Sequence, residues 1–431
     1  MLHKQILKLI DENDVKFIRL AFCDPMGTQK NISIISSELE QAFTQGKALD
    51  VCALPVFSEM SNTDLLLFPD PSSFSLLPWR PRTNSVLRFY CDIKNPDGTN
   101  FSGDGRNMLK NAVNDLNALG FTCKIGTKCE FYLFENNEND EYSMKTFDKG
   151  GYLDISPLDK GENIRREICL YLEQMGLNPE RSFHEKGPGQ NEIDFKFDDP
   201  LFAADNFLTF KSVVKSIAKM NDLFASFMPK PFLNNSGSGL HLNMSLIKDG
   251  ENIFSDKQSK NYKYAENFIA GILDKIAEIT LFLNPINNSY ERFGSFEAPK
   301  YISWSSNVRS QLIKIPVANK GSERIDLRSP DSTINPYIAF SLILQAGLFG
   351  IKNNLQLSRE TEKNFNEIGM QLLPKDLGEA INSAENSEFV KKIIDSSFLE
   401  SYLNLKKNEF AQFEKATNKE EYYKKNDFLR L

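Results

Sequence analysis

The stretch HEKGPGQNEIDF (184–195) is the most informative segment for the fold, because it joins a His–Glu pair to a strand that has one polar face. Side chains alternate across a strand, so Gln190, Glu192 and Asp194 lie on the same side. A polar face on a single strand is typical of an antiparallel sheet that is wet on one side. The stretch therefore predicts a strand, and its function depends on what lies beside it.

Three further segments show the same alternation of polar and apolar side chains. Their polar faces are Lys128, Glu130 and Tyr132 in KCEFYLF, His241, Asn243 and Ser245 in GLHLNMS, and Arg324, Asp326 and Arg328 in RIDLR. Four such strands side by side would form a polar wall. Glu130, Glu192 and the His184–Glu185 pair would then repel one another unless divalent cations lay between them. The guanidinium groups would suit phosphate or carboxylate oxygens.

The chain divides into a small α+β unit and a larger one. Before residue 100, the patterns predict strands at 15–22, 31–35 and 85–93 and a polar helix near 37–45. The segment 95–106 is rich in Gly, Asn, Asp and Pro, which predicts a domain boundary near residue 100. Beyond it, strands mixed with helices favour an antiparallel or mixed sheet over a doubly wound sheet or a TIM barrel. We expect these helices at 104–119, 161–175, 200–221, 261–283, 335–350 and 395–416.

The composition excludes several classes of protein. The 431 residues suffice for two domains, and 41% hydrophobic with 25% charged residues describes a globular chain. A net charge of −7, without a long basic run before the C-terminal tail, argues against nucleic acid as a partner. The most apolar stretch, 336–351, is shorter than a membrane span and contains Gln345, so no membrane association is expected.

Cysteines and histidines indicate the compartment and the kind of metal. The six cysteines are irregularly spaced and form no CxxC pair, which is typical of a protein in a reducing cytoplasm. Only three histidines occur, so a metal site would depend on carboxylates. Carboxylates favour hard cations such as Mg²⁺ or Mn²⁺ over zinc or copper.

A series of motifs along nearly the whole chain resembles the glutamine synthetase family, in the family's order. They are GDGR (103–106), CEFYLF (129–134), KGGYLDISPLDKGENIRREI (149–168), HEKGPGQNEIDF (184–195), AADN (203–206), FMPKP (227–231), GSGLH (237–241), NSYERFGSFEAP (288–299) and RIDLRSPDSTINPYIAF (324–340). The chain looks most similar to the short bacterial, clostridial-like enzymes of this family. The resemblance implies an α+β fold, with a β-grasp N-terminal domain over residues 1–100 and a catalytic domain over 101–431 that holds a curved antiparallel sheet and helices.

The resemblance also implies a role for individual residues. Metal ligands would be Glu130, Glu185 and Glu192 beside the substrate, with His241 and Asp326 on the nucleotide side. Nucleotide contacts would come from Phe197, Ser245, Arg324, Lys314 and Lys128. Arg292 and Gly237 would bind glutamate, and Tyr152 with Asp50 would bind ammonium. Arg309 and Arg328 would neutralise the phosphoryl group, and Glu297 would close a flap over the site.

These roles imply an ATP-dependent glutamate–ammonia ligase that uses Mg²⁺ or Mn²⁺. ATP would phosphorylate the γ-carboxylate of L-glutamate, and ammonia would then displace phosphate to give glutamine and ADP. Asp50 would take a proton from ammonium, and the flap that carries Glu297 would keep water from the acyl phosphate. The resemblance further implies a homo-oligomer, a dodecamer of two hexameric rings, in which a neighbouring subunit donates Asp50 to each site.

Several positions depart from the family pattern. Lys128 stands where the family has a glutamate ligand of the nucleotide-side metal, and Asp326 replaces a longer glutamate of the same site. Either that metal is lost, or the amine of Lys128 takes its place and contacts ATP phosphates directly. Lys314 replaces an arginine, Ser236 an asparagine and Phe183 a histidine. After Asp50, the usual Gly-Ser-Ser becomes Val51-Cys52-Ala53.

Two alternatives to glutamine synthesis follow from these departures. The altered residues after Asp50 suggest a γ-glutamyl ligase for another small amine. Lys128 and Asp326 suggest a catalytically weak paralogue that acts as a regulator. The other metal ligands and arginines persist, which favours the ligase over the paralogue.

Overall fold

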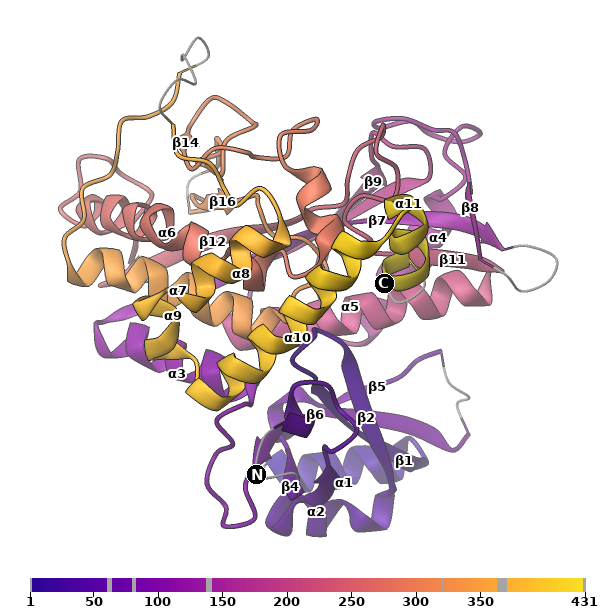
Figure 1. The fold of residues 1–431 in the computed structure, drawn as a ribbon. Coiled ribbons are helices and arrows are strands. Elements are labelled where there is room, and N and C mark those ends of the chain that lie inside the picture. The colour runs from indigo at the N-terminus through magenta and orange to yellow at the C-terminus, as the bar shows by residue number, and fades with distance from the viewer. Residues whose placement is uncertain are drawn as a thin grey trace.

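Two sheets organise the protein, each in its own part of the chain (Figure 1). The computed structural model describes residues 2–59, 64–79, 83–136, 142–319, 321–362 and 370–428. A six-stranded sheet runs in the order β2-β1-β6-β4-β3, with β5 on β6. A ten-stranded sheet runs β14-β15-β16-β12-β7-β10-β9, with β8 and β11 on β7 and β13 on β12. The α+β fold class that the sequence predicts is confirmed.

The smaller sheet belongs to the N-terminal unit. Its elements are α1 (Leu2–Glu12), β1 (Val15–Cys23), β2 (Gln29–Ile35), α2 (Leu39–Gln45), β3 (Lys47–Asp50), β4 (Asp64–Pro69), β5 (Ser75–Leu76) and β6 (Ser85–Lys94). Strand β1 pairs antiparallel with β2 and parallel with β6. The three strands predicted in this region all form. Helix α1 is an addition to the prediction.

The larger sheet and most helices follow residue 100. The strands are β7 (Phe121–Asn136), β8 (Tyr142–Thr146), β9 (Pro179–His184), β10 (Gln190–Phe195), β11 (Leu223–Ser226), β12 (Leu240–Lys248), β13 (Glu251–Asn252), β14 (Trp304–Ser305), β15 (Ile313–Lys314) and β16 (Ile325–Leu327). The helices are α3 (Gly105–Ala118), α4 (Glu162–Gln174), α5 (Pro200–Met220), α6 (Tyr262–Leu283), α7 (Pro336–Lys352), α8 (Leu377–Glu385), α9 (Glu388–Ile393), α10 (Ser396–Lys415) and α11 (Lys419–Tyr423). All six predicted helices form close to their expected bounds.

Helix ends follow the local sequence. Asp104 accepts a hydrogen bond from the Arg106 amide at the start of α3, and Asn335 accepts from the amides of Tyr337 and Ile338 at the start of α7. Proline occupies the first position of α5 and α7, where its missing N–H leaves no hydrogen bond unmade. None of the helices in the described ranges is long and apolar enough to cross a membrane.

The core lies between the larger sheet and the helices packed on it. Leu240, Leu242 and Met244 of β12 are fully buried, whereas His241 and Ser245 on the other face of the strand remain partly accessible. Helices α3 and α5 pack on β7, and α7 packs on α3, α5 and α6. Strand β10 is buried on both faces. Its polar side chains form part of a cavity wall and do not face open solvent. The apolar face of the sheet therefore fixes the direction of its polar face.

Buried ion pairs connect the N-terminal unit to the larger one. The guanidinium of Arg106 lies 2.9 Å from Asp70, 2.7 Å from Asp92 and 2.9 Å from Asp205. Asp70 and Asp92 belong to the N-terminal unit, whereas Asp205 is in α5. Removing one partner of such a network leaves a buried charge uncompensated, so it holds the two units in one arrangement.

Candidate active site

The four polar strands are neighbours in the larger sheet, which is the arrangement that a polar wall requires. In the register of β10 and β7, Glu192 lies opposite Glu130 and Asp194 lies opposite Lys128. On the other side of β7, His241 of β12 lies opposite Lys128. Asp326 of β16 continues the row opposite Asn243. Their polar faces therefore form one continuous wall.

That wall encloses a cavity of about 250 Å³. Fourteen of the predicted site residues line it, and they come from strands and loops far apart in the sequence. They are Lys128, Glu130, Tyr152, Glu185, Glu192, Gly237, His241, Arg292, Glu297, Arg309, Lys314, Arg324, Asp326 and Arg328.

Three predicted residues lie outside the cavity lining. Asp50 is exposed at the end of β3 in the N-terminal unit, where its carboxylate accepts a hydrogen bond from the Cys52 amide at 2.8 Å. Phe197 lies next to the cavity, with the guanidinium of Arg324 6.0 Å from its ring centre. Ser245 is on β12 opposite Lys124, four residues beyond His241.

One end of the cavity is acidic. Ligand oxygens of Glu130, Glu185 and Glu192 all lie within 4.8 Å of one another. Burial and the nearby Glu185 raise the pKa of Glu130 to about 7, and burial, Asp194 and Glu130 raise the pKa of Glu192 well above its usual value. Three carboxylates this close resist ionising together unless a cation lies between them. The cluster therefore fits a hard divalent cation, which prefers oxygen ligands.

Glycines bring the backbone close to Arg292. A side-chain carbon on Gly237 would lie 2.7 Å from the Cγ atom of Arg292, and one on Gly239 would lie 2.8 Å from its Nη2 atom. The buried guanidinium donates from Nη1 to the carbonyl oxygens of Ser329 and Pro330, at 3.0 and 3.3 Å. The Gly239 amide also donates to Glu130 at 2.8 Å. Only glycine fits these positions without a shift of the neighbouring atoms.

The opposite end of the cavity is cationic. Lys128, Lys314, Arg309, Arg324 and Arg328 line it. Burial, followed by the charges of Arg328, Lys128 and Arg292, holds the pKa of the His241 imidazole well below its usual value. This histidine is therefore neutral near pH 7. The surplus of positive charge suits a phosphate-bearing ligand.

Glu297 lines the same cavity, near Lys186 and Arg328. Its carboxylate lies 2.9 Å from the Nζ atom of Lys186 and 3.9 Å from the Nη2 atom of Arg328. Burial raises the pKa of Glu297, but the hydrogen bond from Lys186 and the positive charges of Lys186, Arg328 and Arg309 together lower it below its usual value. The carboxylate is therefore ionised and lies between the cations of Lys186 and Arg328.

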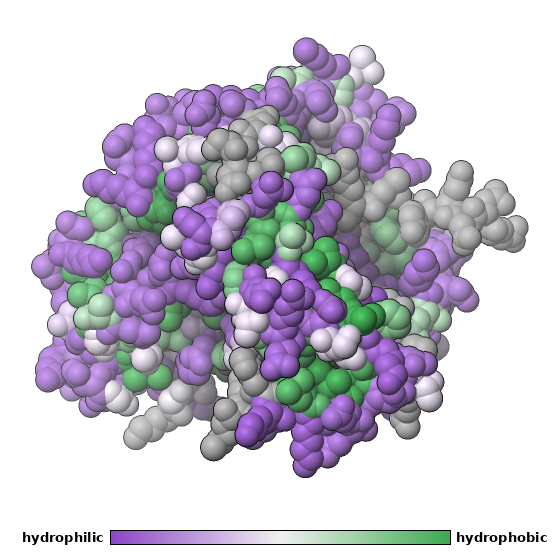
Figure 2. All heavy atoms as spheres, turned by 90° about the horizontal axis from the view of Figure 1, so that it is seen from below, coloured by the Kyte–Doolittle hydropathy of each residue, from purple (hydrophilic) through white to green (hydrophobic). Residues whose placement is uncertain are grey.

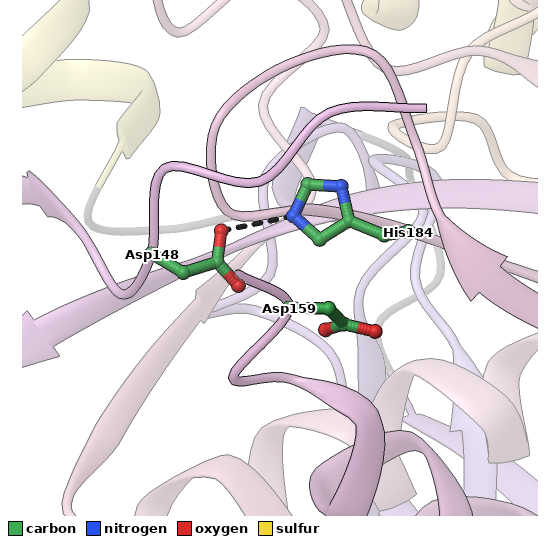
Figure 3. Close-up of side chains that lie close together, drawn as sticks. All are labelled: Asp148, Asp159 and His184. Atoms are coloured by element: carbon green, nitrogen blue, oxygen red, sulfur yellow. Dashed lines mark hydrogen bonds and ion pairs between the residues drawn. The ribbon is translucent and has the colours of Figure 1, made fainter. Parts of the chain in front are cut away.

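A second group of buried side chains consists of Asp148, Asp159 and His184, the residue that precedes Glu185 in the chain (Figure 3). His184 Nε2 lies 2.9 Å from Asp148, and its Nδ1 lies 2.7 Å from the carbonyl oxygen of Glu185. Asp159, beside them in Figure 3, binds the guanidinium of Arg165. Both carboxylates are thus occupied by cationic or hydrogen-bonding partners. The network fixes the backbone at Glu185 rather than offering a second metal site.

Sequence reasoning missed some residues that line or support the cavity. Arg181 of β9 lines it and binds Asp194 through Nε at 2.9 Å, and Gln190 donates to the Gly237 carbonyl at 3.0 Å. Gln190 and Asn243 belong to the predicted polar faces, so the alternation could have identified both. Arg181 and Asp148 could be found only once the strand pairing was known.

Comparisons with known proteins agree with this geometry. Residues 14–96 match the family model for the glutamine synthetase β-grasp domain, and residues 102–425 match the model for the glutamine synthetase catalytic domain. A glutamine synthetase from Clostridium saccharobutylicum is 45% identical over 421 residues, which is 95% of each chain. One from Methanosarcina mazei is 43% identical over 95% of this chain and 94% of its own.

Solved structures give the same result for the fold. A structure described as a GmaS/ADP complex matches with a TM-score of 0.86 and 26% identity, covering 97% of this chain and 98% of that one. The cryoEM structure of Plasmodium falciparum glutamine synthetase matches with the same score and coverage at 23% identity, which supports the fold alone. Fold, cavity and relatives define an enzyme of the ligase class. Within that class, the chain belongs to the glutamine synthetase family.

Proposed function

We propose that the protein joins ammonia to the γ-carboxylate of L-glutamate, using ATP, and releases glutamine, ADP and phosphate. The observation that carries this proposal is the single cavity with three clustered carboxylates at one end and a group of lysines and arginines at the other. Such a cavity can hold a cation against a substrate carboxylate while positive side chains face a transferring phosphoryl group.

In the first step, an oxygen of the γ-carboxylate attacks the terminal phosphorus of ATP, and ADP leaves with the electrons of the broken P–O bond. The carboxylates Glu130, Glu185 and Glu192 would hold Mg²⁺ or Mn²⁺, which supplies charge neutralisation for the anionic reactants. Arg328 and Arg309 neutralise the phosphoryl group during transfer. Arg292 binds the α-carboxylate of glutamate beside Gly237, where the missing side chain lets the backbone lie close to Arg292.

In the second step, ammonia attacks the acyl carbon of γ-glutamyl phosphate and phosphate leaves. Ammonium must first lose a proton, for which Asp50 of the partner subunit is the proposed acceptor. Its carboxylate is ionised near pH 7, because hydrogen bonds from Cys52 hold the pKa of Asp50 below its usual value, and its negative charge can attract ammonium. Glu297, held by Lys186 and Arg328, screens the acyl phosphate from water.

We propose a homo-oligomer, with two stacked hexameric rings as its form. Asp50 is exposed and lies outside the lining of its own chain's cavity, which supports its use by a neighbour. The segment around Tyr152 supports the same idea, because Leu153, Ile155 and Leu158 are 57%, 75% and 57% exposed. Clusters of exposed large apolar side chains are typical of interaction surfaces. Figure 2 shows further apolar patches among hydrophilic side chains on the lower face of the molecule.

Two smaller proposals accompany this function. The boundary between the domains is set at residue 100, in the segment that separates β6 from α3. The enzyme acts in the cytoplasm, in line with six cysteines that are all free.

The test is phosphate release from ATP with Mg²⁺ or Mn²⁺ and glutamate, with and without ammonium, beside a panel of small amines. We expect release that depends on ammonium and matches glutamine formed one for one. Turnover with another amine alone would replace the proposed substrate. Absence of turnover with every amine, while ATP or glutamate still binds, would favour a regulatory paralogue instead.

A further inference from the structure

We infer that the cationic end of the cavity binds no divalent cation of its own, and that the Lys128 ammonium binds nucleotide phosphate oxygens there directly. The inference rests on the proposed function where it assigns the phosphates to a nucleotide. It concerns the part of the wall formed by Lys128, His241 and Asp326.

Lys128 occupies the centre of that part of the wall. It lies directly opposite Asp194 on one neighbouring strand and opposite His241 on the other. Its Nζ atom lies 3.4 Å from the Oδ2 atom of Asp194, and its side chain is 21% exposed. The ammonium is therefore anchored on one side and accessible from the cavity on the other.

The remaining donor groups do not fit a metal ion. The Nδ1 atom of His241 and the Oδ2 atom of Asp326 are 4.0 Å apart, and the same Oδ2 atom lies 3.2 Å from Arg328. The nearby carboxylate of Asp194 is held by Lys128 and by Arg181, whose Nη2 atom is 2.5 Å away. Mg²⁺ is usually held by one or two carboxylates together with water and phosphate oxygens. Here the single carboxylate beside His241 is already engaged by Arg328, and a lysine lies on the other side of the imidazole.

The surrounding charges oppose an added cation as well. Lys128 lies directly opposite His241, and the guanidinium of Arg328 lies 3.2 Å from the Asp326 carboxylate, so a divalent ion between His241 and Asp326 would be repelled by both positive charges. Two close groups of acidic and histidine side chains occur among the residues that the structure describes, and neither contains His241 or Asp326. The acidic cluster at the other end is one of them.

A lysine at this place supplies what a polyphosphate needs. Its ammonium has three donors and no acceptor, and it binds phosphate as a compact charge. Lys314 lies opposite Asp326 on β15, and Arg324 is held by Asn243 at 3.0 Å, so both frame the same region. Nucleotide binding at this end should therefore need less divalent cation than catalysis at the acidic end does.

The number of Mn²⁺ ions bound to the full-length protein tests the inference. It is measured with ADP present, by electron paramagnetic resonance and equilibrium dialysis. We expect Lys128→Glu to bind one more Mn²⁺ per chain than the unchanged protein, because it adds a carboxylate and removes an ammonium. Lys128→Gln should leave the count unchanged, and Glu192→Gln should lower it by one. Lys124→Glu is the matched control, since it reverses a charge on the same strand outside the cavity lining, and it should also leave the count unchanged.

ADP affinity in EDTA gives a second readout. We expect Lys128→Gln to weaken metal-free ADP binding about tenfold, the range of one lost charged hydrogen bond. Equal Mn²⁺ counts for the unchanged protein and a folded Lys128→Glu would overturn the inference, and so would unchanged ADP affinity in Lys128→Gln. Thermal unfolding confirms that each variant is folded. Neither readout requires turnover, so a failure to make glutamine is distinguishable from a failure of this inference.

Discussion

The two ends of the cavity are built on the same strands, yet they carry opposite charge. Glu130 and Lys128 are two residues apart on one face of β7, and their partners Glu192 and Asp194 are two apart on β10. At the first pair the carboxylates face one another and attract a cation. At the second pair a lysine meets an aspartate and neutralises it. The strand pairing thus places the two pairs side by side on the same wall, and the residue type at one position decides whether that part of the wall is acidic or carries a lysine.

The largest effect is expected from breaking the acidic end. Glu192→Gln removes one of three clustered carboxylates, and kcat/KM for glutamine formation should fall about 10³-fold, because metal assistance contributes several kcal/mol. Steady-state assays at saturating Mg²⁺ measure this. Glu180→Gln, an exposed change on the neighbouring strand β9, is the control and should leave activity intact. A loss below tenfold in Glu192→Gln would show that the cluster is not where the metal acts.

The acidic end should also make metal-free stability depend on pH. Burial and Glu185 raise the pKa of Glu130 from 4.5 to about 7, so folding favours its protonated form. That stabilisation is present below pH 4.5 and is lost as the pH rises through 7, at a cost of up to about 3 kcal/mol. Urea unfolding in EDTA from pH 5 to 8 measures the slope. Added Mg²⁺ should flatten the slope, and so should Glu130→Gln. An equal slope in Glu130→Gln would assign it to other groups.

Removing a charge at the cationic end should lower kcat about 10²-fold. Arg328→Gln removes a guanidinium that lies beside Asp326 and Glu297, and the loss of one preorganised donor lowers kcat by about this factor. We expect the Mn²⁺ count to stay unchanged, which separates this end from the acidic one. Arg166→Gln, on the exposed side of α4, is the control. A lower Mn²⁺ count in Arg328→Gln would contradict the division of the cavity.

The smallest effect concerns the support behind the acidic end. Asp148→Asn should weaken Mn²⁺ binding at the Glu130–Glu185–Glu192 cluster about tenfold, because His184 loses the carboxylate that orients it beside the Glu185 carbonyl. ADP affinity in EDTA should not change. Asp154→Asn in the same segment is the control, since its carboxylate contacts the Gly151 amide instead. Equal Mn²⁺ affinity in both variants would remove His184 from this positioning role.

Much of the sheet that carries the cavity could be predicted from local sequence alone. Alternation of polar and apolar residues identified four strands, and their apolar faces could only be buried against helices. The predicted neighbours Glu130 and Glu192 are directly opposite one another. Helix α8 is not among the predicted helices, but it too has a local signal. Asp376 caps its start by accepting a hydrogen bond from the Glu379 amide. Helix caps and strand faces act over a few residues, which is why sequence reveals them.

Other features depend on contacts that no local pattern encodes. Asp148 and His184 are 36 residues apart and meet only because β10 pairs with both β7 and β9. Arg181 looks like a solvated residue of an edge strand, and its role appears only through its register opposite Asp194. The place of Asp50 in catalysis depends on another subunit and stays a prediction.

Isotope transfer tests the central claim most directly, namely that the cavity activates a carboxylate by phosphorylating it. Glutamate labelled with ¹⁸O in its γ-carboxylate is turned over with ATP, Mg²⁺ and ammonium, and the released phosphate is analysed by mass spectrometry. We expect one ¹⁸O atom in each phosphate formed with glutamine, because the carboxylate oxygen leaves with the phosphoryl group. Unlabelled phosphate accompanying glutamine would contradict it.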